Sequence, residues 1–431
     1  MYRKISDFLK SWKESPYRKP LILQGARQVG KTYSILGFGR TNYENVAYFN
    51  FETNPKLSDT FNEDISPDYI IPILSHIASQ TIIKEKTLIV FDEVQLCERA
   101  LTSLKYFCEE APDYHVIAAG SLLGVAVNRA KYSFPVGKVD IKTLYPMDME
   151  EFMLALGEND LVKQIRFCFE NNKAMPSALH SIAMQRYHQY LVIGGMPECV
   201  TQFVSTHDYT LIRHTQDTIL TSYLNDMSKY NSLNEIKKTR LAYDNITVQL
   251  SKKNTRFQYK LIKKGARASE FENAIEWLNL SGIVSQVYRV EHIKKPLENY
   301  RDIDAFKIYV SDLGLLCAKK DLAANDILYM VEEINDFKGG MAENYVNVQL
   351  VINGYKTYYW QSDRGAEIDF IIQREGQIIP IEVKSADNTK AKSLNIYVKS
   401  YNPVYAIKLS AKNFDFKDNK KIVPLYAAFC I

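Results

Sequence analysis

Short apolar runs alternate with longer stretches of helical periodicity in the first part of the chain. The runs predict strands at residues 21–23, 46–51, 87–91, 115–120 and 139–144. Strands that alternate with helices favour a parallel sheet that is covered by helices on both faces. We therefore expect an α/β fold for this part of the chain.

Helical periodicity then continues without strands from about residue 146 to residue 228. It predicts helices at residues 149–156, 161–169 and 181–192, and Gly194-Gly-Met-Pro-Glu198 interrupts the pattern sharply. The region is either a helical lid on the preceding sheet or a plain helical spacer, because the pattern fits both. We place the first domain at residues 1–228.

Residues 229–325 show a pattern typical of a winged helix. Helical stretches precede residues 269–281, where Phe271, Ile275 and Leu278 share one helical face. Two strands, predicted at residues 283–290 and 305–310, then flank a charged loop. A third domain, at residues 326–431, is predicted to contain a helix followed by further strands at residues 358–361, 367–372 and 378–384.

Composition narrows the class of protein. The 431 residues carry a net charge of +4, too small to indicate a nucleic-acid partner without local clustering. Six cysteines lie scattered with no C-x-x-C pair, which favours reduced thiols in a cytoplasmic protein over a disulfide or zinc framework. The nearly apolar run at residues 116–127 is too short to span a bilayer, so we expect no membrane partner.

A glycine-rich motif follows the first predicted strand. Residues 25–32 read G-x-x-x-x-G-K-T, the P-loop pattern in which backbone N–H groups and a helix N-terminus face a phosphate. Lys31 is expected to reach the β- and γ-phosphates of ATP, and the Thr32 hydroxyl is expected to bind Mg²⁺. A chance strand–helix turn is the alternative. The predicted nucleotide-binding residues here are Gly25, Ala26, Arg27, Gln28, Val29, Gly30, Lys31 and Thr32.

Two carboxylates directly follow the predicted strand at residues 87–91. They lie at the carboxyl edge of the predicted parallel sheet, which is where such sheets bind ligands. Asp92 is predicted to hold Mg²⁺ as a Walker B acid, and Glu93 to polarise the attacking water. An exposed acidic pair at the start of a loop is the alternative. Ser121, which follows the strand at residues 115–120, is a candidate sensor of the γ-phosphate.

Three motifs in this order resemble the prokaryotic AAA-type ATPases that carry a C-terminal domain of unknown function. They are residues 25–32, Phe91-Asp-Glu-Val-Gln95 and Gly194-Gly-Met-Pro-Glu198. The resemblance implies an AAA+ core with one strand between the phosphate-loop and Walker B strands, a helical lid, and a homo-oligomer with a trans-acting arginine. Related sequences place Arg before the last core strand, where this chain has Lys138, and Arg129 is the other candidate.

Lysine and arginine cluster between residues 252 and 267 without an acidic residue. With Phe257 and Tyr259 interleaved, the cluster is a candidate surface for DNA or RNA, and a solvated basic face is the alternative. Glu270, Glu272 and Glu276 on the following helix favour backbone contacts over base reading. The predicted contacts are Lys252, Lys253, Arg256, Lys260, Lys263, Lys264 and Arg267.

The third domain carries charged residues on apolar strands. Asp369 lies early in one predicted strand, and Glu382 and Lys384 lie two residues apart on the next, so they share a face. With Glu343 on the preceding helix, this order resembles the PD-(D/E)XK restriction-nuclease fold. The resemblance implies a second Mg²⁺ or Mn²⁺ on Asp369 and Glu382, with Glu343 as an auxiliary ligand and Lys384 beside the scissile phosphate. A solvated ion pair is the alternative.

Together these patterns predict a Mg²⁺-dependent ATPase in which Lys31, Asp92 and Glu93 are catalytic. We expect nucleotide state to be coupled to nucleic-acid engagement by the C-terminal parts. Two alternatives stay open: a regulatory switch that holds ATP and acts through protein contacts, and a metal-dependent nuclease gated by the ATPase.

Overall fold

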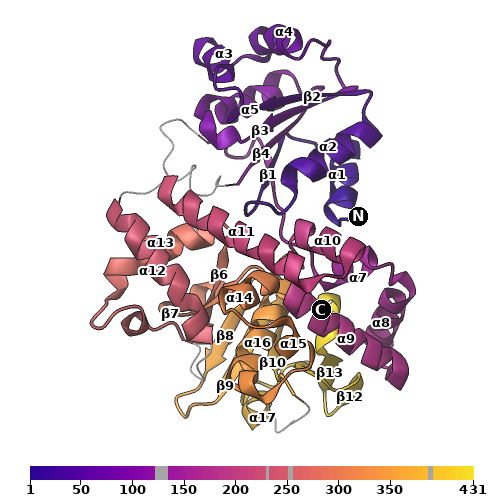
Figure 1. Ribbon diagram of the computed structural model, residues 1–431, viewed down its shortest axis with the longest axis vertical. Helices are drawn as coiled ribbons and strands as arrows, with labels where there is room; N and C mark the ends of the chain where they lie inside the picture. The colour runs from indigo at the N-terminus through magenta and orange to yellow at the C-terminus, as the bar shows by residue number, and fades with distance from the viewer. Residues whose placement is uncertain (122–133, 230–232, 251–255, 387–391) are drawn as a thin grey trace. The chain divides into compact units, whose positions relative to one another are not determined.

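A computed structural model describes residues 1–121, 134–229, 233–250, 256–386 and 392–431. The described chain forms two compact units (Figure 1). The N-terminal unit comprises residues 2–145 and 280–282, and the C-terminal unit comprises residues 1, 146–279 and 283–431.

A five-stranded parallel sheet forms the centre of the N-terminal unit. Its order is β2-β3-β4-β1-β5, so β4 lies between β1 and β3 as predicted. The predicted parallel α/β fold is confirmed, because each strand lies at one of the apolar runs. The strands are β1 (Leu21–Gln24), β2 (Asn45–Asn50), β3 (Thr87–Asp92), β4 (His115–Gly120) and β5 (Asp140–Thr143).

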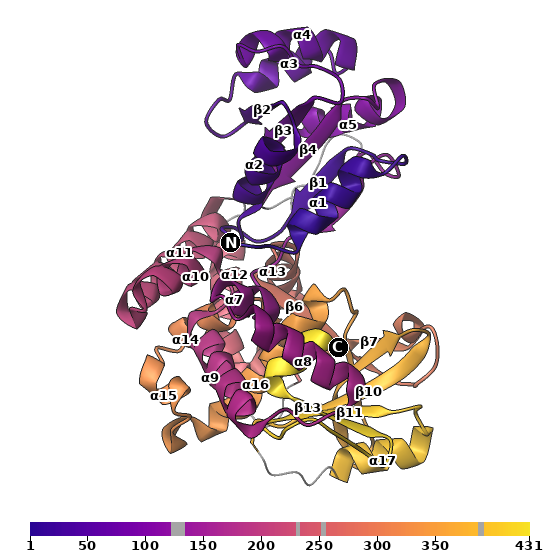
Figure 2. The same cartoon turned by 90° about the vertical axis from the view of Figure 1, so that its right-hand side faces the viewer.

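Helices cover both faces of this sheet (Figures 1 and 2). On one face, Phe91 of β3 is buried among the rings of Phe51, Phe61 and Phe107. On the other face, Gly39 of α2 lies against Val46. Burial on both sides explains why β3 and β4 are apolar without alternation. The helices are α1 (Ile5–Glu14), α2 (Lys31–Asn42), α3 (Leu57–Glu63), α4 (Pro67–Ile77) and α5 (Glu98–Glu110), with a 3₁₀ turn η1 (Val94–Leu96).

Helices form the first half of the C-terminal unit, as the periodicity predicted. No helix of the described residues is long and apolar enough to cross a membrane. The helices of the first half are α7 (Met149–Ala155), α8 (Asn159–Asn171), α9 (Ser177–Ile193), α10 (Pro197–Thr206), α11 (Tyr209–Lys229), α12 (Leu233–Leu250) and α13 (Ala268–Leu280). Four more helices follow later in the chain: α14 (Leu313–Lys319), α15 (Ala324–Leu328), α16 (Asn335–Ile352) and α17 (Lys392–Tyr401). Short 3₁₀ turns are η2 (Tyr259–Leu261), η3 (Leu297–Tyr300), η4 (Glu332–Ile334) and η5 (Leu425–Cys430).

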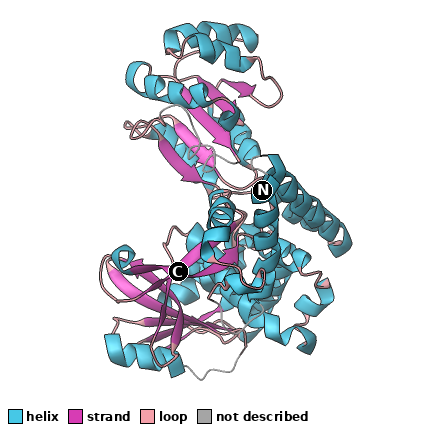
Figure 3. Ribbon diagram, turned by 90° about the vertical axis from the view of Figure 1, so that its left-hand side faces the viewer, coloured by secondary structure: helices cyan, strands magenta, loops and turns pink. Residues whose placement is uncertain are grey.

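An eight-stranded mixed sheet fills the rest of this unit (Figure 3). Its order is β12-β13-β11-β10-β9-β8-β6-β7. The strands are β6 (Val284–Val290), β7 (Arg301–Val310), β8 (Tyr358–Gln361), β9 (Glu367–Arg374), β10 (Gln377–Val383), β11 (Ala406–Ser410), β12 (Asp415–Lys417) and β13 (Lys420–Pro424).

The β6–β7 hairpin expected as a wing belongs to this larger sheet. β6 pairs antiparallel with β7 and parallel with β8, so hydrogen bonds continue from the hairpin into the strands of the predicted third domain. The buried face of α13, with Phe271, Ile275 and Leu278, is as predicted. The three-domain division at residues 228 and 325 remains a prediction, and the sheet itself is continuous across the second boundary.

Candidate functional site

The P-loop bends where its glycines allow it. Gly25, directly after β1, has a φ of +150°, and a Cβ there would lie 2.1 Å from the carbonyl oxygen of Leu144. Gly30 has a φ of +89° and is the N-cap of α2. A larger side chain at Gly25 would push the loop away from the backbone that follows β5. The loop is therefore held close to the sheet edge, with the N-terminus of α2 at its end.

Lys31 closes the loop from the first turn of α2. Its Nζ donates hydrogen bonds to the carbonyl oxygens of Gly25, at 2.9 Å, and Ala26, at 2.8 Å. The side chain is 7% exposed. The ammonium group thus lies at the start of the loop, among its main-chain atoms.

Asp92 and Thr32 meet across the loop. The Thr32 hydroxyl donates to Asp92 Oδ2 at 2.8 Å, and Asp92 is buried at the end of β3. Residue 93 turns out of the strand with a φ of +51°, and its N–H donates to Asp92 Oδ1 at 3.0 Å. The Glu93 side chain is half-buried and accepts a hydrogen bond from Gln95. The two acids therefore diverge, although they are neighbours in sequence.

The structure adds Tyr48 and Asn50 of β2 to this site. The Tyr48 hydroxyl donates to Asp92 Oδ2 at 2.7 Å, and Asn50 Nδ2 lies 3.1 Å from that hydroxyl oxygen. Burial raises the pKa of Tyr48 to about 12; the hydrogen bond from Asn50 lowers it, and that to Asp92 raises it. Sequence reasoning missed both residues. The available signal was a strand in which tyrosine and asparagine stand two apart, so that they share one face.

Ser121 follows β4 and is buried, and β4 lies between the phosphate-loop and Walker B strands. The prediction that Ser121 senses the γ-phosphate assumed this position for its strand. Lys138 forms an ion pair with Glu109 at 2.8 Å. Arg129, the other residue considered as an arginine finger, lies outside the described residues.

The donor set fits a magnesium–triphosphate group. The Thr32 hydroxyl and the Asp92 carboxylate lie within hydrogen-bond distance of each other. Both are hard oxygen ligands of the kind that Mg²⁺ binds together with phosphate oxygens and water. A helix N-terminus and a lysine adjoin them, and both favour anions.

The basic segment lies in the C-terminal unit between α12 and α13. Its described basic side chains are exposed, whereas Lys252 and Lys253 lie outside the described residues. Phe257 is buried and stacks on Phe306 with ring centroids 5.4 Å apart, so this ring belongs to the core and does not offer a face to a base. The basic residues of the described part are Arg256, Lys260, Lys263, Lys264 and Arg267.

The predicted nuclease residues Asp369 and Glu382 lie on the adjacent strands β9 and β10. Asp369 Oδ2 accepts a hydrogen bond from the Val383 N–H at 2.7 Å, and Glu382 Oε1 lies 3.4 Å from Lys384 Nζ. Both acids are buried. Burial, followed by the charge of Glu343, raises the pKa of Asp369 to about 7.

Lys307 of β7 is a buried cation that the sequence reasoning did not include. Its Nζ lies 2.6 Å from Glu367 and 3.5 Å from Glu343, which also accepts a hydrogen bond from Tyr309 at 3.0 Å. Burial opposes the charge on Lys307, but the nearby carboxylates outweigh burial and raise its pKa. Glu343, predicted as an auxiliary metal ligand, is therefore the partner of a lysine. A lysine inside the apolar run at residues 305–310 was the available signal.

The second metal ion is not shown by the structure. Within the part of the chain that is described, no three His, Cys, Asp or Glu side chains gather around a common point. Glu382 Oε2 is buried and has no hydrogen-bond partner among the described atoms.

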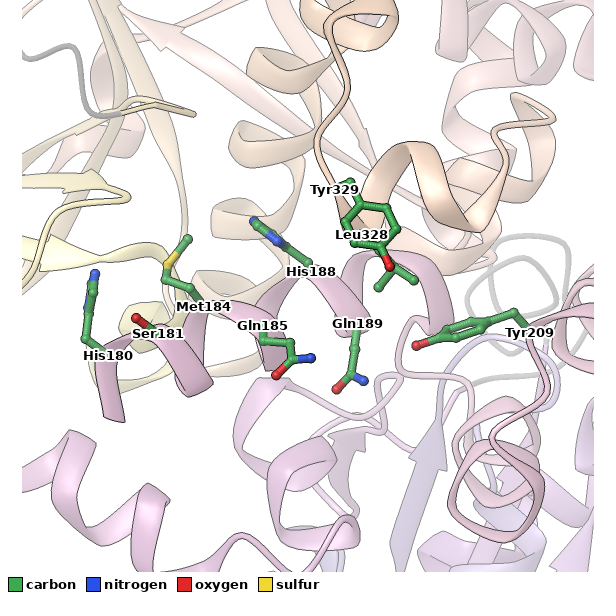
Figure 4. Close-up of a pocket in the computed structure, with 9 residues that line it drawn as sticks. All are labelled: His180, Ser181, Met184, Gln185, His188, Gln189, Tyr209, Leu328 and Tyr329. Carbon is green, nitrogen blue, oxygen red and sulfur yellow. The ribbon is translucent and has the colours of Figure 1, made fainter. Parts of the chain in front are cut away.

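A pocket of ≈ 590 Å³ also lies in the C-terminal unit, and it contains none of the predicted site residues (Figure 4). None of the described residues that line it is Lys, Arg, Asp or Glu, so it offers imidazole and phenol rings, amides, a hydroxyl and apolar side chains, and no carboxylate or ammonium group. The lining residues are His180, Ser181, Met184, Gln185, His188, Gln189, Tyr209, Leu328 and Tyr329.

Family models match three parts of the chain. A model described as an AAA domain matches residues 17–153, and two models of domains of unknown function, DUF8612 and DUF4143, match residues 184–326 and 338–428. The AAA match implies ATP binding and hydrolysis with Mg²⁺. It confirms the expected order of an AAA-type domain followed by a region of unknown function, and no match describes a nuclease.

Solved structures give distant likenesses. C. elegans PCH-2 is 12% identical to this chain, with a TM-score of 0.27. The match covers 46% of this chain and 60% of PCH-2, so it spans less than two thirds of the length of PCH-2. The Aeropyrum pernix ORC1 protein, solved in complex with DNA, is 11% identical with a TM-score of 0.27, over 74% and 91% of the two chains. The A. pernix ORC2 protein is 12% identical with a TM-score of 0.32, over 77% and 91%. Curated protein sequences give no match.

Proposed function

We propose that the protein is a Mg²⁺-dependent ATPase whose nucleotide state controls nucleic-acid engagement by its C-terminal unit. The observation that carries the ATPase part is the 2.8 Å hydrogen bond between the Thr32 hydroxyl and the Asp92 carboxylate. It brings together, beside a helix N-terminus, the two side-chain types that hold Mg²⁺ on a nucleoside triphosphate.

Each residue then has a separate role. Lys31 exchanges its two carbonyl partners for β- and γ-phosphate oxygens, because hydrogen bonds between charged groups are stronger than those to neutral carbonyls. Thr32 and Asp92 hold Mg²⁺, which supplies charge neutralisation on the phosphate oxygens. Glu93, which diverges from Asp92, orients and deprotonates the attacking water, and Ser121 contacts the γ-phosphate.

The nucleic-acid part rests on the basic segment at residues 256–267. Its five described cations would release about as many counterions, giving a slope of log K against log salt of about −4 to −5 for duplex DNA. The exposed acids of the adjacent α13, Glu270, Glu272 and Glu276, oppose base reading. We therefore propose contacts to the sugar–phosphate backbone.

A metal-dependent nuclease is the second candidate, and the unpartnered Glu382 Oε2 beside Asp369, among the described atoms, favours it. Mg²⁺ usually takes one or two protein carboxylates and completes its shell with water and phosphate. Lys307 counts against this candidate, because its ammonium group already pairs with Glu343 and Glu367 and would repel a metal ion bound nearby.

The ATPase is tested by hydrolysis and nucleotide binding in wild type, Lys31→Ala and Glu93→Gln. Lys31→Ala should lose binding, whereas Glu93→Gln should bind ATP but hydrolyse it about 10²–10⁴-fold more slowly. Lys10→Ala, at an exposed position of α1, is the matched control. Equal rates in wild type and Lys31→Ala would refute the assignment. Retained ATP without turnover in wild type would instead support the regulatory switch.

The same reactions with DNA or RNA test the coupling. The double variant Lys264→Glu and Arg267→Glu should lose stimulation and binding, while Lys399→Glu with Lys417→Glu makes the same charge change at exposed positions elsewhere. If both double variants behave alike, the basic segment is not the contact. Cleavage that disappears in Asp369→Ala would establish the nuclease candidate.

A further inference from the structure

Tyr48 lies on the edge strand β2, whose neighbour β3 ends in Asp92. The parallel register pairs Tyr48 with Val90 and Asn50 with Asp92. Tyr48 and Asn50 point to the same face because they are two residues apart. The long tyrosine side chain therefore reaches along the sheet to the carboxyl end of β3, where the phosphate loop lies.

The hydrogen bonds around Tyr48 fix the direction in which its hydroxyl donates. Asn50 Oδ1 accepts the N–H groups of Glu52 and Thr53, each at 2.9 Å, so the amide nitrogen of Asn50 is the end that faces Tyr48. An amide nitrogen only donates, and the Tyr48 oxygen therefore accepts from it. The Tyr48 hydrogen is left for Asp92 Oδ2, 2.7 Å away.

Asp92 is consequently held by donors from three parts of the site. Thr32 and Tyr48 donate to Oδ2, and the main-chain N–H of residue 93 donates to Oδ1. Thr32 belongs to the phosphate loop and is itself an expected ligand of the metal ion. Tyr48 is a side chain that fixes the carboxylate from outside the loop.

We propose that Tyr48 is a positioning residue that holds Asp92 in the orientation required to bind Mg²⁺. This inference rests on the proposed ATPase function. Partners that orient a metal ligand typically change metal affinity by about 10–100-fold when they are removed.

Tyr48→Phe removes only the hydroxyl. The binding of a fluorescent ATP analogue is measured in EDTA and across a Mg²⁺ titration, together with the ATPase rate. We expect unchanged affinity in EDTA, about a tenfold rise in the Mg²⁺ concentration that gives half-maximal binding, and a maximal rate near that of wild type at saturating Mg²⁺. Tyr17→Phe, on a side chain that is 87% exposed, is the matched control.

A double-mutant cycle with Asp92→Asn separates positioning from a structural role. If Tyr48 acts through Asp92, Tyr48→Phe should not raise the Mg²⁺ requirement further in the Asp92→Asn background. Equal losses of affinity in EDTA and in Mg²⁺ would show that Tyr48 only stabilises the sheet, and would overturn the inference. So would an unchanged Mg²⁺ requirement. A wild type that does not bind ATP in response to Mg²⁺ would refute the proposed function itself.

Discussion

Gly195 offers a sharp test of how the C-terminal unit is packed. Its φ lies outside the left-handed region, so φ by itself does not require glycine there. Space is the constraint: a Cβ would lie 2.0 Å from the carbonyl oxygen of Met147 and 2.8 Å from its nitrogen. These are main-chain atoms and no rotamer change can relieve the contact. Gly195→Ala must therefore separate two segments of backbone.

The expected cost follows from the hydrogen bonds at this contact. The Met147 N–H donates to the Gly195 carbonyl at 2.7 Å, and the Met147 carbonyl accepts the Tyr190 hydroxyl at 2.7 Å. The Gly195 N–H donates to the buried carboxylate of Asp312 at 2.6 Å. Each buried group left without its partner costs about 1–3 kcal/mol, so we expect Gly195→Ala to lower the free energy of unfolding by about 3–5 kcal/mol.

Urea unfolding followed by tryptophan fluorescence measures this effect, because Trp277 and Trp360 lie in the C-terminal unit. Gly339→Ala is the matched control, because Gly339 lies inside α16 and has space for a methyl group. Apart from the adjoining backbone of the helix, no described atom lies within 4 Å of the position that this methyl group would take. That variant should gain about 0.5–1 kcal/mol, the usual advantage of alanine in a helix. Equal midpoints for the two variants would refute the steric reasoning.

Two further predictions concern the charged group of the large sheet. Lys307→Met should lower the free energy of unfolding by about 3–5 kcal/mol, because two carboxylates lose a buried cation. The control Lys356→Met, which breaks an exposed pair with Glu298, should cost less than about 1 kcal/mol. Equal urea midpoints for these two variants would contradict the prediction. The raised pKa of Asp369 means that the folded state keeps a proton that the unfolded state loses, so stability should fall as pH rises from about 4 to 7. Asp369→Asn removes that slope of up to about 1.4 kcal/mol per pH unit, and parallel stability–pH curves for variant and wild type would refute it.

Local patterns were sufficient for the sheet and loop of the N-terminal unit. The apolar runs located β1 to β5, and the order of Gly25, Gly30 and Lys31 fixed the loop, since strand burial and glycine conformation are decided by neighbouring residues. The position of β4 between β1 and β3 came from the family resemblance and is confirmed. Apart from that strand order, these are features that a short stretch of sequence determines.

Features that join distant segments were not predictable in the same way. Tyr48 reaches Asp92 on the neighbouring strand β3, and Gly195 lies against Met147 because helices α7 and α9 bring their ends together. The Gly194-Gly195 pair was visible as a break, but its reason is a long-range contact with Met147 and Asp312. Likewise, the strands expected as an isolated wing carried no local sign that β6 would pair with β8.

The two acidic sites differ in what already balances their charge. Asp92 is held by hydroxyl and main-chain donors, which orient a carboxylate without neutralising it, and so leave its charge to attract a cation. Glu343 and Glu367 face the ammonium group of Lys307, which a metal ion would have to oppose or displace. Charge balance favours the P-loop site as the place where Mg²⁺ acts, and makes Lys307 the residue to remove when testing whether the C-terminal acids can bind a metal ion at all.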